Sequence, residues 1–304
     1  MKVIRARVLG FCSGVHRAVD IARQVSSSDY LRVYTLGPLI HNERVLESLR
    51  ERGVVFLKEG EIPALPENSA VIIRAHGVPP VVERELIGRG ITLIDATCPH
   101  VKISQGKAKD FAERAYRVFL AGEEKHAEVE GIRGYVEDVP GQAFTRCFVV
   151  SNPLEAEAAA EELYRREPEA KTALIGQTTI REEEYRLMGE KIWQFFPSLE
   201  IADTICAATA ERQKALRELC ADVNALIIVG SGESANTKRL LALAGEMGKP
   251  AWLVETPADV PAEIGNYETI GLSAGASTPD SLITEVEKAL ARVCLHIEQP
   301  LKFL

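Results

Sequence analysis

The sequence predicts an α/β protein made of three similar domains with mainly parallel sheets. Two observations lead to this expectation. A strand-like apolar segment precedes, and a helix-like segment follows, each of the widely spaced Cys12, Cys98 and Cys206. Other apolar runs end in polar or glycine-rich tips, two of them in each expected domain. Continuous apolar runs followed by helices are typical of buried parallel strands.

The three cysteine segments share one order of elements. "VIRARVLGF" precedes Cys12, "ITLIDAT" precedes Cys98 and "LEIADTI" precedes Cys206, and Pro99 stands where the first turn of a helix accepts proline. Each interval between the cysteines is long enough for one small α/β unit. We therefore expect a first domain at 1–98 with Cys12, a second at 99–203 with Cys98 at its start, a third at 204–290 with Cys206, and a tail at 291–304.

Six further strands are expected between the cysteine corners. In parallel sheets, ligands gather beyond the carboxyl ends of the strands, so the polar tips of these segments should lie along one kind of edge. The segments are "VYTLGPLIHN", "AVIIRAHGV", "YRVFLAGEEKHAE", "TALIGQTT", "NALIIVGSGESANT" and "ETIGLSAGAST".

Composition excludes several classes of protein. The 304 residues include 36 basic and 44 acidic side chains, for a net charge of −8, without a basic run that would bind a nucleic acid backbone. No stretch reaches the ~20 apolar residues of a membrane span. The start "MKVIRARVLG" is too short and too charged for a secretory signal, so a cytoplasmic location is expected.

The matched cysteines indicate a metal centre. A lone cysteine after an apolar strand is usually a small buried side chain, and Cys147, Cys220 and Cys294 are interpreted in that way. The other three stand at expected helix starts, where partial positive charge favours the thiolate. Three thiolates would suit zinc with an added histidine, or an iron–sulfur cluster. A set that stops at three protein ligands leaves one metal position open to substrate.

Polar side chains at the strand tips indicate an anion site. His41, His76 and His126 each follow a strand, and together with Ser234, Asn236 and Ser277 they would suit a compact, multiply charged anion. The loop "GSGESANTKRL" has the strand, glycine and helix start of a phosphate site but lacks the GxxxxGK[ST] pattern of nucleotide-binding loops.

Glu128 is the candidate acid. It lies two residues beyond the tip histidine His126, where burial would raise the pKa of its carboxyl enough to deliver protons near neutrality. Thr178 in "GQTTI" offers a hydroxyl that can pass those protons on, although threonine in such a turn is often only a helix cap.

With these motifs the chain resembles the LytB/IspH family, the reductases of 4-hydroxy-3-methylbut-2-enyl diphosphate in the non-mevalonate isoprenoid pathway. The resemblance covers nearly the whole chain and rests on several motifs in the family's order. They are "GFCSGV", "LIHNERV", "AHGV", "DATCP", "HAEVEG", "GQTT", "DTICAAT", "SANTKRL" and "SAGASTPD".

The resemblance implies a pseudo-threefold trefoil around a [4Fe-4S] cluster, with one iron open to the substrate hydroxyl. It assigns Cys12, Cys98 and Cys206 to the cluster, Glu128 to proton donation and Thr178 to orienting the hydroxyl. It also implies a monomer that receives electrons from ferredoxin or flavodoxin and forms isopentenyl and dimethylallyl diphosphate. The substrate's diphosphate would be held by His41, His76, His126, Ser234, Asn236 and Ser277.

Four residues depart from the family's usual motifs: Ala127, Ala207, Glu233 and Ala235. Ala127 replaces a proline, and Ala235 replaces a serine that commonly adds a diphosphate contact. The thiols, Glu128 and Thr178 are unaffected. We therefore expect weaker or rearranged diphosphate binding with the chemistry preserved.

Three other functions would suit parts of the pattern. One is an iron–sulfur reductase or dehydratase that acts on a different hydroxylated compound, and another is a non-enzymatic iron–sulfur redox sensor. The third is a zinc-dependent hydrolase, which would be colourless and indifferent to oxygen.

Overall fold

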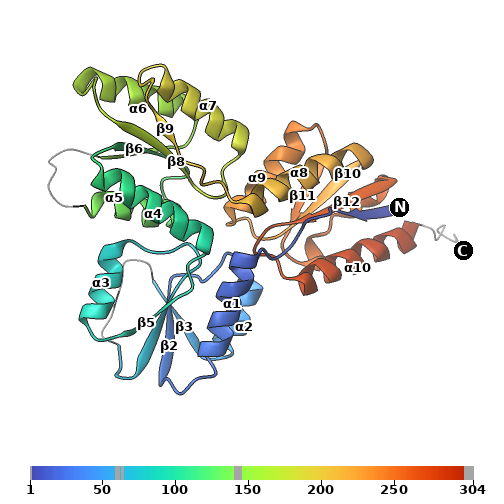
Figure 1. The fold of residues 1–304 in the computed structure, drawn as a ribbon. Coiled ribbons are helices and arrows are strands. Elements are labelled where there is room, and N and C mark those ends of the chain that lie inside the picture. The colour runs from blue at the N-terminus through green and yellow to red at the C-terminus, as the bar shows by residue number, and fades with distance from the viewer. Residues whose placement is uncertain (1, 59–61, 63–64, 140–145, 298–304) are drawn as a thin grey trace, which may run out of the picture. The chain divides into compact units, whose positions relative to one another are not determined.

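The structure, a computed structural model, describes residues 2–58, 62, 65–139 and 146–297 of the chain. These residues form three four-stranded sheets with helices beside them (Figure 1). Every strand pair in the three sheets is parallel. The predicted α/β class with three parallel sheets is therefore confirmed.

The first sheet has the strand order β3-β2-β4-β5. Val71 and Ile73 of β4 are fully buried and pack with Leu86 of α3. The elements of this part are α1 (Ser13–Val25), β2 (Arg32–Leu36), α2 (Glu43–Arg50), β3 (Val54–Leu57), β4 (Ser69–Ile73), α3 (Pro80–Gly88) and β5 (Thr92–Asp95).

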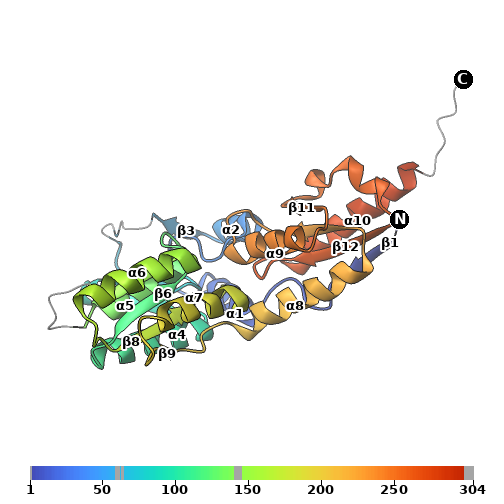
Figure 2. The same ribbon diagram turned by 90° about the horizontal axis from the view of Figure 1, so that it is seen from above.

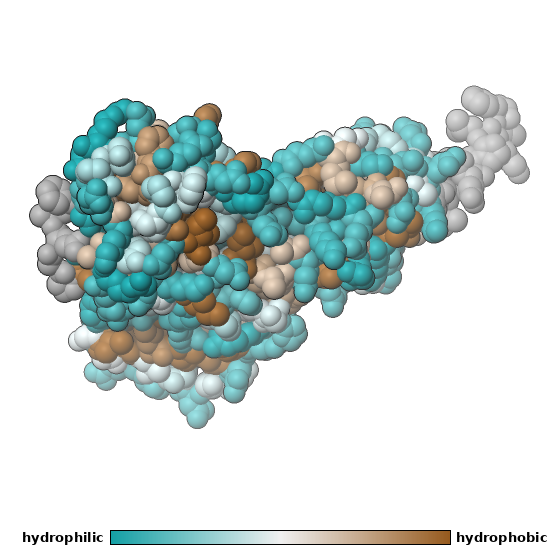
Figure 3. Space-filling view, turned by 45° about the horizontal axis from the view of Figure 1, so that its top comes forward, coloured by the Kyte–Doolittle hydropathy of each residue, from teal (hydrophilic) through white to brown (hydrophobic). Residues whose placement is uncertain are grey.

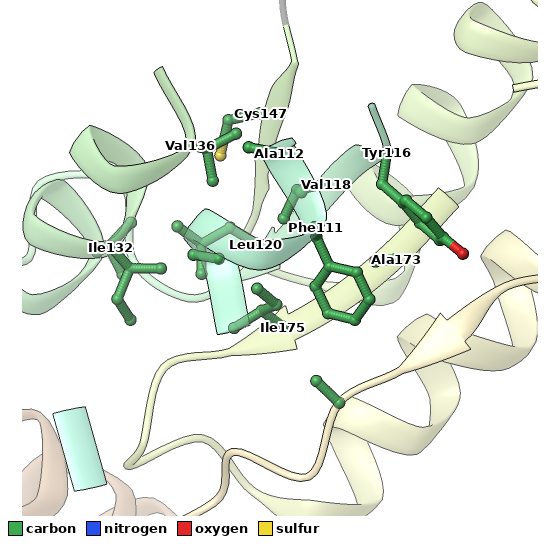
Figure 4. Close-up of a cluster of buried hydrophobic side chains, with 13 residues drawn as sticks. Phe111, Ala112, Tyr116, Val118, Leu120, Ile132, Val136, Cys147, Ala173 and Ile175 are labelled. Atoms are coloured by element: carbon green, nitrogen blue, oxygen red, sulfur yellow. The ribbon is translucent and has the colours of Figure 1, made fainter. Parts of the chain in front are cut away.

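The second sheet has the order β7-β6-β8-β9 and is covered on both faces. Val118 and Leu120 of β6 belong to the core beneath α4 and α5 (Figure 4), whereas the alternate residue Phe119 packs with α6 and α7. The elements are α4 (Pro99–Glu113), β6 (Arg117–Ala121), α5 (Ala127–Glu137), β7 (Cys147–Val150), α6 (Pro153–Arg166), β8 (Thr172–Gly176), α7 (Glu182–Trp193) and β9 (Glu200–Ile201).

The third sheet has the order β1-β12-β10-β11. Ile227 of β10 packs with α10, and its neighbour Ile228 packs with α8 and α9, so the helices cover both faces (Figure 2). The elements are β1 (Lys2–Arg5), α8 (Ala207–Asp222), β10 (Ala225–Val229), α9 (Ala235–Glu246), β11 (Ala251–Val254), the short helices η1 (Pro257–Asp259) and η2 (Ala262–Asn266), β12 (Thr269–Ala274) and α10 (Asp280–Ile297).

The amino-terminal strand lies in the third sheet, which differs from the expected first domain of 1–98. Residues 2–5 pair with β12, and the remainder of "VIRARVLGF" is not strand. Two compact units result from the contacts: one holds the described residues of 1–16, 41–47 and 207–304, and the other holds 17–40 and 48–206. At the other end, α10 continues to Ile297, past the expected start of the tail.

On the face drawn in Figure 3, hydrophilic residues cover most of the described surface and the hydrophobic residues lie in separate patches. Within the part of the chain that the structure describes, no helix has the length and hydropathy of a membrane span. The large exposed hydrophobic side chains include Val81, Ile87, Leu154 and Trp193.

Gly271 of β12 provides a test of core packing in the third sheet. A Cβ atom at this position would lie 2.5 Å from a methyl carbon of Leu226 and 2.9 Å from one of Leu219. We expect Gly271→Ala to lower the free energy of unfolding by about 1–3 kcal/mol through overpacking, measured by urea denaturation. The control is Gly245→Ala in α9, where a Cβ would meet nothing within 4 Å and where alanine favours the helix. Equal urea midpoints of unfolding for Gly271→Ala and Gly245→Ala would contradict the expected overpacking at position 271.

Candidate functional site

Each of Cys12, Cys98 and Cys206 immediately precedes a helix, as the sequence predicts. The helices α1, α4 and α8 begin at Ser13, Pro99 and Ala207. The strands before the cysteines, β1, β5 and β9, are edge strands of three different sheets. All three side chains are partly exposed, and none is in a disulfide.

The backbone amide of each cysteine is bonded to the tip of the adjacent strand. The Cys98 N–H donates to the Ala75 carbonyl at 2.9 Å, and the Cys206 N–H donates to the Thr178 carbonyl at 3.0 Å. In the other unit, the Cys12 N–H donates to the Ala276 carbonyl at 3.1 Å. These tips carry His76, Thr178 and Ser277, three of the predicted substrate residues. Each cysteine is thus tied directly to a residue expected to bind substrate, or to that residue's neighbour in sequence.

The predicted acid Glu128 and Thr178 form a buried pair. The Thr178 N–H donates to Glu128 Oε1 at 2.6 Å, and the Thr178 hydroxyl donates to Oε2 at 3.0 Å. Glu128 is 2% exposed. Burial favours the neutral carboxyl, whereas the two donated hydrogen bonds favour the carboxylate. The pair can therefore hold a proton at a fixed atom, away from bulk water.

His126 is the N-cap residue of α5. The Glu128 N–H donates to His126 Nδ1 at 3.2 Å. Because Nδ1 accepts this bond, a neutral ring carries its proton on Nε2 and can donate from there. The ring of His76 packs edge-on against the ring of His126, with the centroids 5.3 Å apart. The structure therefore brings the predicted residues His76, His126, Glu128 and Thr178 together in one unit.

The second unit holds the other predicted anion-binding residues. The Ser277 hydroxyl donates to the His41 carbonyl at 3.0 Å, which brings these two tips together. Ser234 caps α9, with its Oγ accepting from the Thr237 N–H at 3.4 Å. Asn236 is 4% exposed, and neither atom of its side-chain amide has a hydrogen-bond partner within the described chain. An unsatisfied buried amide is costly, so this group is suited to a bound polar ligand.

Two of the residues that depart from the family pattern occupy equivalent positions, each at the start of a helix. Ala127 and Ala235 are the first residues of α5 and α9, directly after His126 and Ser234. Both side chains are buried. A hydroxyl at position 235 would therefore lie beside the capping Ser234.

Gln177 is a site residue that the sequence analysis did not single out. Its Oε1 accepts from the Glu123 N–H at 3.1 Å, and its Nε2 donates to Thr179 Oγ1 at 3.0 Å. These bonds connect the tip after β6 with the tip after β8. Its position beside Thr178 in "GQTT" is the signal that marks it.

Asp95 in "DATC" has a local structural role. Its carboxylate accepts from the Thr97 N–H at 2.9 Å and pairs with Lys102 at 2.8 Å. Burial opposes ionisation, but the hydrogen bonds from Lys102 and Thr97 outweigh it and lower the pKa of Asp95. The aspartate three positions before Cys98 thus shapes the turn that carries the cysteine.

The cysteines predicted to be core residues differ clearly from the other three. Cys147 and Cys220 are buried within hydrophobic clusters, as expected. Burial raises the pKa of the Cys147 thiol to about 12, so this group stays protonated at neutral pH. The side chain of Cys294 lies outside the described residues. Cys12, at the start of α1, is partly exposed, and its Sγ accepts a hydrogen bond from the Val15 N–H at 3.4 Å.

The chain is similar to known proteins over almost its full length. A family profile described as LytB protein matches residues 3–291. A 4-hydroxy-3-methylbut-2-enyl diphosphate reductase of Treponema denticola is 42% identical over 295 residues, covering 95% of this chain and 99% of the relative. The reductase of the same name from Aquifex aeolicus is 35% identical and covers 96% of each chain.

Solved structures agree with these relatives. The E-1-hydroxy-2-methyl-but-2-enyl-4-diphosphate reductase from Plasmodium falciparum aligns with a TM-score of 0.86 at 26% identity, covering 95% of this chain and 88% of that one. A structure described as (E)-4-hydroxy-3-methyl-but-2-enyl diphosphate reductase, the terminal enzyme of the non-mevalonate pathway, aligns with a TM-score of 0.67 at 34% identity. It is covered completely, together with 96% of this chain. The chain therefore belongs to the LytB protein family.

Proposed function

We propose that this chain is a 4-hydroxy-3-methylbut-2-enyl diphosphate reductase, which catalyses the last step of the non-mevalonate isoprenoid pathway. Beyond family membership, one observation carries the proposal. Thr178 donates its hydroxyl hydrogen bond to the buried Glu128, and its carbonyl accepts the Cys206 N–H. A candidate proton source and a candidate metal ligand are thus held by the same residue.

Cys12, Cys98 and Cys206 would hold a [4Fe-4S] cluster with one iron open to substrate. The donor set fits this group: three thiols at helix starts, outside disulfides and distinct from the buried core cysteines. When bound, the cluster would supply electrons and a Lewis-acidic iron for the substrate hydroxyl. Zinc could polarise the hydroxyl but could not deliver electrons, so iron–sulfur suits a reduction better.

The diphosphate would be held by His41, His76, His126, Ser234, Asn236 and Ser277. Imidazole, hydroxyl and amide donors position an anion without adding fixed positive charge. This is compatible with a chain whose net charge is −8. Among the described residues the side-chain amide of Asn236 has no hydrogen-bond partner, so a diphosphate oxygen could supply one.

The reaction removes the allylic hydroxyl as water. Two electrons and two protons enter, the C–O bond breaks, and a C–H bond forms in the product, which is isopentenyl or dimethylallyl diphosphate. Hydroxide leaves poorly, so a proton from Glu128 to the departing oxygen lowers the cost of cleavage. Thr178 would orient that oxygen through its hydroxyl. The electrons would come singly from ferredoxin or flavodoxin to a monomeric, cytoplasmic enzyme.

Glu128→Gln tests the acid. We expect kcat to fall by about 10²–10⁴-fold, because the amide keeps the shape of the side chain but cannot supply the proton. Iron and sulfide content should equal those of the parent. The matched control is Glu130→Gln on the exposed face of the same helix, which should retain full turnover. Parent-level turnover in Glu128→Gln would refute the assignment.

The cysteine assignment is tested by metal content. After anaerobic reconstitution, serine at position 12, 98 or 206 should remove most of the iron, because a hydroxyl is a poor substitute for a thiolate. Cys220→Ala should keep the iron and lower only stability, since this side chain is buried in the core. Mössbauer spectra with and without substrate should resolve one distinct iron in the parent. A full complement of iron in Cys12→Ser would exclude Cys12 as a ligand.

Asn236 and Ala235 test the diphosphate site. We expect Asn236→Ala to raise KM by about 10- to 100-fold, the effect of losing a hydrogen bond to a charged group. Thermal stability should not fall, because the amide has no partner within the described chain to lose. Ala235→Ser should lower KM by adding a donor. A KM that responds to neither change would show that this tip does not bind the diphosphate.

A further inference from the structure

Arg17 connects the helix after Cys12 with the loop of Cys98. It lies on α1, and its guanidinium donates from Nη1 to the Thr97 carbonyl at 3.1 Å and from Nη2 to the Asp95 carbonyl at 3.2 Å. These carbonyls lie one and three positions before Cys98. Asp95 is the last residue of the edge strand β5 and Thr97 follows it, so one side of the backbone there has no neighbouring strand to bind.

Lys107 makes the corresponding contact for Cys206. It lies on α4, the helix that begins after Cys98, and its Nζ donates to the Asp203 carbonyl at 2.6 Å. Asp203 stands three positions before Cys206, just beyond the edge strand β9. A basic side chain on the helix that follows one cysteine thus again binds the backbone segment that precedes another cysteine.

Arg212 makes the third contact, in the other unit. It lies on α8, the helix after Cys206, and its Nη2 donates to the Gly10 carbonyl at 2.7 Å. Its Nη1 donates to the Ala208 carbonyl at 2.7 Å, and the side chain is 3% exposed. Gly10 stands two positions before Cys12.

The three contacts form a closed order along the chain. The helix after Cys12 binds the loop of Cys98, the helix after Cys98 binds the loop of Cys206, and the helix after Cys206 binds the loop of Cys12. The same kind of contact therefore occurs three times, once for each cysteine loop. This argues against chance pairing of surface side chains.

Other cations on the same helices behave differently. Arg23 of α1 pairs with Asp20, and Lys109 of α4 pairs with Glu113, each within one turn. Such exposed pairs contribute little to a fold. Arg17, Lys107 and Arg212, which we call the clamping cations, instead bind backbone oxygens of sequence-distant loops. These hydrogen bonds are charge-assisted and therefore stronger than neutral ones.

We propose that Arg17, Lys107 and Arg212 are positioning residues that pin the three cysteine loops and place a positive charge close to each thiolate. The pinning does not require a bound cluster. The effect of the charge on a cluster rests on the proposed function: reduction adds negative charge, and a nearby cation stabilises the reduced state.

Amide hydrogen exchange on the cluster-free, full-length chain tests the pinning. Arg17→Gln should speed exchange in a peptide covering 95–98 by roughly threefold to tenfold and leave 203–206 unchanged. Lys107→Gln should do the reverse. The controls Arg23→Gln and Lys109→Gln should change neither peptide. Exchange at 203–206 that is identical in Lys107→Gln and Lys109→Gln would overturn the pinning. Arg212 is buried, so its replacement risks misfolding and is not needed for the test.

Redox titration of the reconstituted protein, followed by electron paramagnetic resonance, tests the charge. At a fixed solution potential, Arg17→Gln and Lys107→Gln should lower the ratio of reduced to oxidised cluster by about threefold to tenfold, and tenfold corresponds to 59 mV for one electron. Arg17→Lys and Lys107→Arg should restore the parent ratio. If Arg17→Gln and Lys107→Gln gave the same ratio of reduced to oxidised cluster as the control Lys109→Gln, the proposed effect of the positive charges would be refuted. A parent chain that binds no cluster would instead refute the proposed function and leave the exchange result standing.

Discussion

A single backbone hydrogen bond, made three times, is the constraint on which the site depends. The amides of Cys12, Cys98 and Cys206 donate to the strand tips at Ala276, Ala75 and Thr178. Parallel strands in register bring their carboxyl ends to one edge, so this bond can form wherever an edge strand runs beside a central one. Because it joins backbone atoms, this bond holds each cysteine next to a polar strand tip whichever side chains the tip carries. The chemistry at each tip can then vary while the cysteine stays in place.

The polar groups of the site differ in how the fold satisfies them. Glu128 is buried but accepts two hydrogen bonds from Thr178, so the protein itself supplies partners for both of its carboxyl oxygens. Asn236 is buried without such support from the described chain. A group of the first kind suits proton transfer, because its position is fixed by the fold and it lies away from bulk water. A group of the second kind suits binding, because the ligand supplies the partner that folding leaves out.

Much of the fold was predictable because buried parallel strands are continuous apolar runs that end in recognisable tips. The strands that were missed, β3, β7 and β11, are short outer edge strands with no matched cysteine after them, whereas β1, β5 and β9, which are no longer, were marked by the cysteine that follows each. The membership of β1 in the third sheet was also missed, because pairing between distant segments leaves no local signal. The site residues were predicted by motif; Glu128 and Thr178 are hydrogen-bonded to each other, and the roles inferred for them stay predictions. The three clamping cations were not identified, because their partners are backbone atoms that carry no sequence pattern, and Gln177 was missed although it stands next to Thr178.

The pairing of β1 with β12 has a consequence for the order in which the protein is made. Residues 2–5 are synthesised long before residues 269–274, the strand with which they pair. Domains generally fold as units during synthesis, and contacts between distant segments form late. The sheet that supports Cys12 is therefore incomplete until residues 269–274 have been synthesised, whereas the strands preceding Cys98 and Cys206 can pair with their neighbours earlier. A metal that needs all three thiols in their folded positions can be inserted only after that point.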